Sequence, residues 1–434
     1  MEASVKKLPL EGVRVVDLSM MWAGPVATKL LGDLGAEVLK IESPSAWDNI
    51  RTLIAQPGSP EPWNSSYYFN TYNRSKKSVT LDLAQERGRE VFLQLLVHCD
   101  VLVENYRADV LDGLSLSYEV LRAANPQLVI VSMAGFGKSG DDSGLVGFGP
   151  VIEMMSGLTS LTGYHDDNDV SYKCGVSYGD PVAGVAAAGA VVLGLLQRRR
   201  SGQAPIIDLA QREVAATLAG AAFVAAQRSP DVTHHGNRHP SGAVAPRGCY
   251  RCADEARPER HGSALLAARA ADEQWIALSA MDEAQWAALA PLLGRPQWAA
   301  LTLAERIERY DEIDLVIAAW AGTQQGAEAV TVLRDAGIAA SRVLDTVAIH
   351  DDPHLRSRRF WTELAHPDMP VGWKQPGPAW RLMGVDTEPR QPAPRFGQHT
   401  RAVLGELLGF DEATLNELAA AAIIADAPIN PGSG

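Results

Sequence analysis

The chain has 434 residues, of which 46% are hydrophobic and 21% charged, so it is long enough for two or three domains with substantial cores. Its net charge of −13 argues against nucleic acid or a membrane surface as a partner, and an anionic ligand must therefore be held by local positive groups. The four cysteines and the absence of a signal-peptide core in MEASVKK predict a reducing compartment, the cytoplasm.

The first half of the chain alternates apolar strands with helices. Strands are predicted over 13–18, 36–41, 78–82, 101–105 and 128–133. Helices are predicted over 24–34 and 84–97, the second of them amphipathic. This alternation predicts βαβ units and an α/β, Rossmann-like domain with a mostly parallel sheet. No GxGxxG motif follows the first strand, which argues against an ordinary dinucleotide site.

Two irregular segments interrupt this pattern. Residues 42–70 contain Pro, Ser, Trp and Asn without periodicity and are predicted to form a surface loop. Residues 135–149 read GFGKSGDDSGLVGFG and follow a predicted strand. They are predicted to form a Gly-rich loop at the end of the sheet where open α/β folds bind ligands.

A single carboxylate stands before the longest apolar stretch of the chain, within Tyr178–Gly189 (YGDPVAGVAAAG). Pro181 suits the first position of a helix, and Asp180 suits its N-cap. The helix is predicted to end after three arginines, at Ser201–Gly202. Val182–Leu196 is too short and too rich in Gly and Ala for a membrane span, so a packed helix is predicted. Asp180 would then be an ionised carboxylate held at the positive end of a buried helix.

The second half of the chain predicts a smaller α+β domain over 249–339, after an Ala-rich helix at 210–228 and a polar linker at 229–248. The large domain would comprise 1–228, completed by 340–434. Strands in the small domain are predicted at 249–252 and 275–279, and helices near 282–293, 302–309 and 325–335. A strand at 339–343, loops over 345–398 and helices over 399–408 and 411–421 are expected to return to the large domain.

Motifs spread over nearly the whole chain occur in a familiar order. They are Leu10–Pro44, Asn73–Leu83, Asp100–Leu111, Ala124–Gly137, Tyr178–Gly189, Ser201–Glu213, Gly236–Pro240, Cys249–Cys252, Ala336–Asp345 and His399–Phe410. Together these motifs resemble the class III CoA-transferases, the family of formyl-CoA:oxalate and carnitine CoA-transferases. The resemblance implies a discontinuous large domain, a small domain, and a homodimer whose two chains interlock as rings.

The resemblance also implies a reaction in which CoA moves from an acyl-CoA donor to a carboxylic acid. A side-chain carboxylate attacks the thioester, and the released thiolate then attacks the resulting anhydride to give an aspartyl-CoA thioester. This chemistry needs a fixed, ionised carboxylate, backbone donors for an oxyanion and exclusion of water. Asp180 aligns with the catalytic aspartate of the family, and Gly135–Gly149 or Gly236–Gly248 would supply the donors. Acyl-CoA is a substrate here, and no permanently bound cofactor or metal is expected.

The CoA site is expected in the loops that follow the strands. By resemblance its residues are Met21, Trp22, Ala23, Ser43, Leu81, Asn105, Tyr106, Arg107, Val146 and Phe148. Several family members carry basic residues where this chain has Ser43, Gly113 and Val146. Substitutes for holding the phosphates are sought among Arg74, Lys76, Lys77 and Arg107. Trp22 stands where formyl-CoA transferases carry a glutamine, which predicts a larger and more apolar acyl pocket.

An acyl-CoA racemase or isomerase of the same fold is the first alternative. The α-methylacyl-CoA racemases use a His–Asp pair, with the histidine in a GHDxNY-like motif after the Gly-rich loop. This chain reads VGFGP at Val146–Pro150, without a histidine. Because a racemase needs an acid and a base on opposite faces of the carbon, the missing partner argues against it.

Two non-enzymatic alternatives remain. A zinc module would use His239, Cys249, Cys252 and His261, but their spacing fits no familiar zinc pattern. A non-catalytic CoA-binding protein would have no need of Asp180. Both alternatives are therefore disfavoured.

Overall fold

The computed structural model describes residues 7–167, 169–229, 232–253, 255–256 and 271–429. The chain divides into two compact units. Unit 1 contains Met1–Leu158, Cys174–Val224 and His354–Gly434, and unit 2 contains Thr159–Lys173 and Ala225–Pro353.

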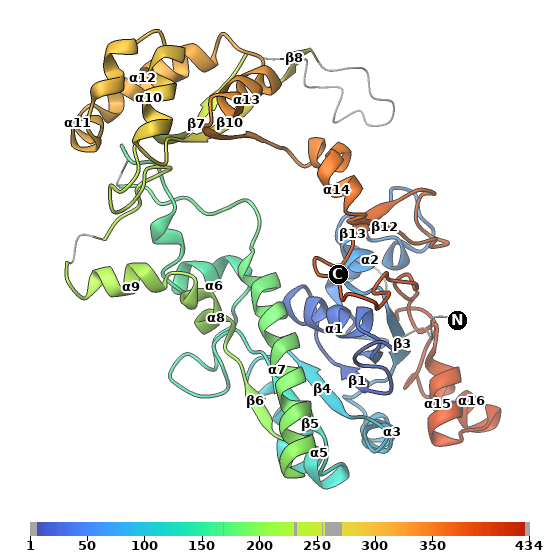
Figure 1. The fold of residues 1–434 in the computed structure, drawn as a ribbon. Coiled ribbons are helices and arrows are strands. Elements are labelled where there is room, and N and C mark those ends of the chain that lie inside the picture. Colours follow the sequence, from blue (N-terminus) through green and yellow to red (C-terminus); the bar gives the residue numbers. More distant parts are fainter. Residues whose placement is uncertain (1–6, 168, 230–231, 254, 257–270, 430–434) are drawn as a thin grey trace. The chain divides into compact units, whose positions relative to one another are not determined.

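Unit 1 is built on a six-stranded parallel sheet with the order β3-β2-β1-β4-β5-β6 (Figure 1). The strands are β3 (Lys76–Thr80), β2 (Glu37–Glu42), β1 (Arg14–Asp17), β4 (Val101–Glu104), β5 (Val129–Ser132) and β6 (Ile206–Asp208). All but β6 were predicted, because a parallel strand buried on both faces is a continuous apolar run. The Rossmann-like parallel sheet is confirmed. The sequence analysis missed β6, whose three residues are partly exposed.

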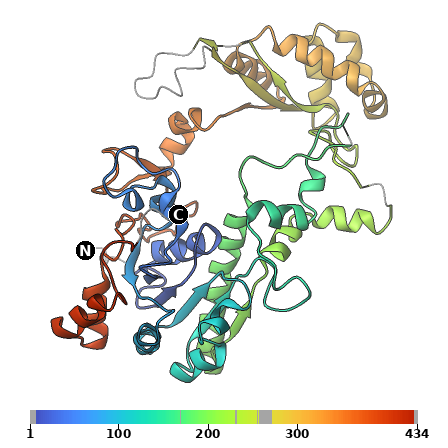
Figure 2. The ribbon, with the colours of Figure 1, turned by 180° about the vertical axis from the view of Figure 1, so that it is seen from behind.

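Helices cover both faces of this sheet (Figure 1, Figure 2). Neighbouring strand residues point to opposite faces, so Val15 packs in one hydrophobic cluster and Val16 in the other. The Val15 face is covered by α1 (Ala23–Asp33) and α7 (Gly179–Ser201). The Val16 face is covered by α3 (Glu86–Leu96), α4 (Val110–Gly113), α5 (Tyr118–Ala124), α15 (Thr400–Leu408) and α16 (Glu412–Ala420).

Two predictions for unit 1 need correction. The segment 42–70 is only partly a loop, because it contains η1 (Asn49–Thr52), η2 (Pro62–Asn64) and the start of α2 (Tyr67–Tyr72). Ser66 caps α2, its Oγ accepting the Phe69 N–H at 3.1 Å. The predicted helix at 210–228 is two helices, α8 (Gln211–Thr217) and α9 (Gly220–Ala226), and they separate beside a glycine, a weak helix former. Other elements are α6 (Gly149–Met155), α14 (Pro353–Ser357), β12 (Trp361–Glu363) and β13 (Lys374–Pro376).

Unit 2 contains a three-stranded antiparallel sheet with the order β11-β10-β7. The strands are β7 (Arg247–Arg251), β10 (Trp275–Ser279) and β11 (Ala339–Val343). The prediction that 339–343 returns to the large domain is wrong, since β11 pairs along its whole length with β10. The helices are α10 (Glu283–Leu292), α11 (Leu303–Glu308), α13 (Gly326–Asp335) and α12 (Tyr310–Ala321), which was not predicted. Short elements are β8 (Glu255–Ala256), β9 (Ala271–Asp272), η3 (Thr159–Leu161), η4 (Pro296–Ala300) and η5 (Ala348–Asp351).

Helix α7 is longer than the apolar stretch suggests. Its 23 residues pass the length and hydropathy test for a membrane-crossing helix, and it is the one described helix to do so. The expectation that the stretch is too short was therefore wrong. One side of α7 nonetheless packs on α1 and on the sheet through small residues such as Ala183 and Ala187, as expected for a layer of the α/β unit.

Candidate active site

Asp180 is the second residue of α7, which begins at Gly179 with Tyr178 as its N-cap. The prediction that Asp180 is the N-cap and Pro181 the first helical residue is therefore wrong by two positions. Pro181 still lies in the first turn of α7. Backbone N–H groups there have no acceptor within the helix, so the N–H that proline lacks breaks no helical hydrogen bond. The capping acceptor comes from another helix, because the Gly179 N–H donates to Glu153 Oε1 on α6 at 3.1 Å. The predicted end is confirmed, with Gly202 in the left-handed conformation at φ 72°.

The carboxylate of Asp180 lies against the first residue of α6. A Cβ atom placed on Gly149 would be 2.0 Å from Asp180 Oδ2 and 2.5 Å from Ser177 Cβ. Gly149 is itself buried, so no side chain fits between the two helices at this point. Only glycine allows the start of α6 to approach Asp180 this closely.

Helix α1 approaches the same end of α7. Gly184 lies one turn after Asp180, on the same side of the helix, and a Cβ atom there would be 2.6 Å from the Ala23 carbonyl oxygen. Asp180 therefore faces the first turn of α1. The first turns of α6 and α7 meet at the half-buried carboxylate, and the first turn of α1 lies against α7 at Gly184, one turn further on.

An aromatic cluster borders the carboxylate. Trp22 lies 5.5 Å from Tyr72 and 6.1 Å from Tyr68, measured between ring centroids. Burial, followed by Tyr68 and the negative charge of Asp180, raises the pKa of the Tyr72 hydroxyl to about 12. Tyr72 is therefore a neutral phenol near Asp180. These rings present an apolar surface that excludes water from one side of the site.

The loop after β1 is fastened to the loop after β4. The Met20 N–H donates to Asn105 Oδ1 at 2.8 Å, and Asn105 Nδ2 donates to the Met20 carbonyl at 2.8 Å. Met21 has a φ of +65°, and its N–H donates to Asp48 Oδ1 at 2.9 Å. In the sheet, β2 lies on one side of β1 and β4 lies on the other. The loops that follow β1 and β4 therefore flank the crevice where such sheets bind ligands. Strained backbone of this kind gathers at ligand sites.

Buried charges hold this loop from beneath. Lys40 Nζ lies 2.9 Å from Asp48 Oδ2 and donates to the Ser19 carbonyl at 2.8 Å. Lys76 Nζ lies 2.9 Å from Asp17 Oδ2. Burial alone would raise the pKa of Asp17, but Lys76 and Lys40 together lower it to about 2. The network therefore stays charged and fixes the position of the Met21 amide.

The remaining residues predicted for CoA all follow the carboxyl ends of strands. Ser43 Oγ donates to Asp82 Oδ1 at 3.2 Å, and Val146 and Phe148 are exposed. The Leu81 side chain is fully buried in the core, so only its backbone could meet a ligand. Tyr106 packs against the same core.

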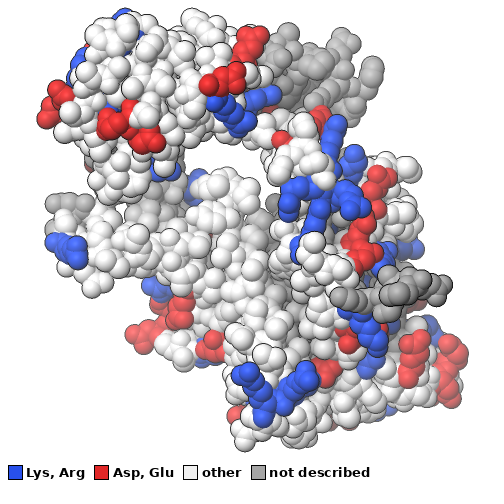
Figure 3. All heavy atoms as spheres, viewed as in Figure 1, with Lys and Arg blue, Asp and Glu red and all other residues white. Residues whose placement is uncertain are grey.

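Two of the basic residues considered for the phosphates are excluded by burial. Arg74 lies 2.8 Å from Asp33, and Lys76 belongs to the network under the loop. Lys77 forms an ion pair with Glu37 at the edge of the sheet where the parallel strands begin, away from the predicted CoA loops. Arg107 lies at the carboxyl edge, is exposed, and pairs with exposed Asp109 at 2.6 Å, a pair that a phosphate could replace. Elsewhere in unit 1, Lys and Arg gather around α14 and the β12–β13 hairpin (Figure 3), where Arg356, Arg358 and Arg359 are exposed.

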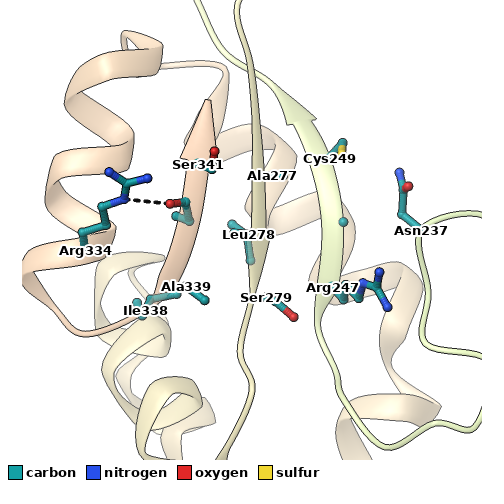
Figure 4. A pocket seen from close by; sticks show the side chains of 12 residues that line it. Asn237, Arg247, Cys249, Ala277, Leu278, Ser279, Arg334, Ile338, Ala339 and Ser341 are labelled. Atoms are coloured by element: carbon teal, nitrogen blue, oxygen red, sulfur yellow. Dashed lines mark hydrogen bonds between the residues drawn. The ribbon is translucent and has the colours of Figure 1, made fainter. Parts of the chain in front are cut away.

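Unit 2 contains none of the residues predicted to contact CoA. A cavity of about 510 Å³ lies over β7, β10 and β11, lined by residues that include Arg247, Cys249 and Ser279 (Figure 4). Cys249 is exposed and Cys252 is buried, and both are free thiols. His261 lies outside the described residues, and no group of three metal-binding side chains occurs within the described ranges. The zinc alternative gains no support.

Two residues at the site were missed by the sequence analysis, Tyr72 and Glu153, and both come from segments distant in sequence from α7. Gly149 ends the Gly-rich segment 135–149 that was predicted to supply backbone donors.

Comparison with known proteins gives a consistent answer over nearly the whole chain. The model of CoA-transferase family III matches residues 10–257 and 257–400. The succinyl-CoA:glutarate CoA-transferase of Mus musculus is 30% identical over 424 residues, covering 96% of this chain and 90% of that protein. The succinyl-CoA–D-citramalate CoA-transferase of Chloroflexus aurantiacus is 30% identical over 421 residues, covering 96% and 98%. A CaiB/BaiF family protein from Brucella suis has a similar crystal structure, with a TM-score of 0.79, 26% identity, and coverage of 93% and 100%.

Proposed function

The chain belongs to CoA-transferase family III, and from this premise we propose that it moves CoA from an acyl-CoA to a carboxylic acid through a covalent intermediate on Asp180. The relatives of matching length are named for succinyl-CoA, which makes succinyl-CoA the first donor to test. The observation that carries the proposal is the contact of Asp180 Oδ2 with the first residue of α6. A carboxylate that served only as a helix cap would have no reason to be fixed against a second helix.

The chemistry follows from what a carboxylate can do beside a thioester. Asp180 attacks the acyl carbonyl, giving a mixed anhydride and CoA thiolate. The thiolate attacks the Asp180 carbonyl, which releases the donor acid and leaves an aspartyl-CoA thioester. The acceptor carboxylate then attacks this thioester, and the freed thiolate takes the acceptor acyl group from the second anhydride. Asp180 ends as the carboxylate with which it began.

The surroundings of Asp180 suit this sequence of steps. Pro150, the second residue of α6, has no N–H, but the N–H groups of Gly149 and Val151 have no acceptor within the helix, and we propose that they stabilise an oxyanion beside Gly149. The Trp22–Tyr68–Tyr72 cluster shields the anhydride from water and gives the acyl group an aromatic wall, in line with the apolar pocket predicted from Trp22. CoA would lie along the loops of Met21, Asn105 and Val146, with Arg107 available to a phosphate.

Trapping the intermediate tests this proposal. The protein is incubated with succinyl-CoA and with a panel of other acyl-CoA donors in the absence of acceptor, then treated with hydroxylamine or borohydride and digested. A peptide containing Asp180 should be modified with any donor that the enzyme uses, because both reagents react with a thioester and not with a free carboxylate. Asp180→Asn serves as the unmodified control. Turnover without modification at Asp180 would mean transfer in a ternary complex and would refute the proposed mechanism.

We also propose that the enzyme is a cytoplasmic homodimer. Cys99, Cys249 and Cys252 are free thiols, which fits a reducing compartment. Val185, Val192, Leu193 and Leu196 are exposed along one side of α7, opposite the side that packs on α1. The named relatives are enzymes of about the same length as this chain. A second copy of the chain is therefore the partner that suits this apolar stripe, interlocked as the resemblance implies.

A charge in the stripe should break the dimer. Leu193 is 67% exposed in the single chain, so Leu193→Glu leaves the monomer fold intact but places an unpaired charge in each copy of the interface. Self-association measured by light scattering should weaken by at least about 100-fold. Leu315→Glu, at an exposed position on α12, is the matched control and should change nothing. A stable dimer in Leu193→Glu, or a wild-type monomer, would contradict the proposed interface.

A further inference from the structure

Glu153 is a buried carboxylate that the transfer chemistry leaves unused. It lies on α6, and only 2% of its surface is exposed. Its Oε1 accepts the N–H of Gly179, the residue immediately before Asp180, at 3.1 Å. Burying a carboxylate is costly unless hydrogen bonds or charges compensate, so a residue of this kind at the first amide of α7 calls for a specific role.

Helix α6 thus touches the start of α7 at two points. Gly149 and Glu153 are four residues apart, so both lie on the same side of α6. Gly149 contacts the Asp180 carboxylate, and Glu153 holds the Tyr178–Gly179 peptide, one residue before Asp180. The two contacts fix the position of the first turn of α7 along α6, and they also fix the rotation of that turn about the α7 axis.

The Gly179 N–H has no ready substitute for this acceptor. A first-turn amide lacks a partner within its own helix, and a Cβ atom placed on Gly179 would lie 3.5 Å from Glu153 Cγ and 3.8 Å from Ala215 Cβ. The negative charge of Glu153 also lies at the positive end of α7, which favours the contact. Burial and then this charge raise the pKa of Tyr178, the N-cap residue, so the carboxylate acts on the very start of the helix.

We propose that Glu153 is a positioning residue for CoA transfer, which rests on the function proposed for Asp180. It does not touch substrate. Asp180 must act first as a nucleophile through its oxygen and then as an electrophile at its carbonyl carbon. The thiolate attacks that carbon from one face of the planar carbonyl group. Both approaches depend on the orientation of one carboxyl group, and that orientation is set by the peptide that Glu153 holds.

Three variants separate the acceptor from the charge. Glu153→Gln keeps an oxygen at the same reach, Glu153→Asp keeps the charge but draws it back by one methylene, and Glu153→Leu removes both. We expect kcat to stay within about threefold of wild type in Gln, and to fall about 30-fold in Asp and about 100-fold in Leu, the scale of a 1 Å misplacement. KM for both substrates should stay within about twofold. Accumulation of the trapped aspartyl-CoA should slow by the same factors.

Controls tell a positioning role from loss of stability. Asp33→Asn breaks a buried ion pair with Arg74 at the opposite end of α1 from Ala23, so it should lower the melting temperature without changing kcat of the folded enzyme. Wild-type kcat in Glu153→Leu, or equal losses in Gln and Asp, would overturn the inference. If Leu does not fold, the predicted order of Gln above Asp still decides it. Asp180→Asn is assayed alongside: transfer retained there would refute the proposed function, whereas failure confined to the Glu153 variants refutes only this inference.

Discussion

Replacing Asp180 by Asn is expected to abolish CoA transfer, with a loss of about 10⁴-fold or more, the scale on which removal of a covalent nucleophile is felt. Asn has almost the same shape as Asp, so the contact with Gly149 should survive. Its amide, however, cannot attack a thioester as an anion. Transfer from acyl-CoA to a panel of acids is measured by mass spectrometry, and CoA binding by calorimetry should remain close to wild type.

Asp180→Glu provides the geometric counterpart to that experiment. It keeps the charge but moves the attacking oxygens by about an ångström, which can cost roughly a hundredfold in rate. The Oδ2 atom already lies against Gly149, so the longer side chain also lacks room. Near-wild-type turnover in Asp180→Asn would remove Asp180 from the mechanism. Full activity in Asp180→Glu would show that the position is tolerant and that the packing around it does not govern the reaction.

The parts of the fold that could be predicted are those encoded locally. Strands β1 to β5 were found because burial on both faces demands a short apolar run. Strand β6 is too short and too exposed to carry that signal, and α12 was missed although α10, α11 and α13 around it were found. The pairing of β11 with β10 is a long-range choice that no local pattern contains.

The same distinction applies to the candidate site. Asp180 was placed near the start of a helix because a proline and a Gly/Ala-rich run follow it, and the resemblance raised it above an ordinary cap. The true start, two residues earlier than expected, depends on Glu153 from another helix, which a local capping rule cannot foresee. Arg74 and Lys76 were considered for phosphates because Arg and Lys clustered near a strand end suit phosphate binding, whereas here both are buried in ion pairs.

Replacing Gly149 by Ala is expected to cost about a hundredfold in kcat, although the substitution adds only a methyl group. A Cβ atom at this position would lie 2.0 Å from Asp180 Oδ2 and 2.5 Å from Ser177 Cβ, far inside van der Waals contact. The carboxylate must therefore turn or move away from the start of α6. That movement separates it from the amides proposed to hold the oxyanion, so both half-reactions should slow together.

Gly144→Ala is the matched control for this experiment, because it lies in the same Gly-rich loop and a Cβ atom there meets nothing within 4 Å. It should retain wild-type kcat and stability. Gly149→Ala should keep its affinity for CoA, since the added methyl group meets Asp180 and Ser177 and not the loops after β1 and β4. Rates are measured with the same acyl-CoA and acid pair for both variants, together with the rate at which the aspartyl-CoA intermediate forms. Equal activity in Gly149→Ala and Gly144→Ala would mean that Asp180 can react from a second orientation, and that its contact with α6 is packing without consequence for the chemistry.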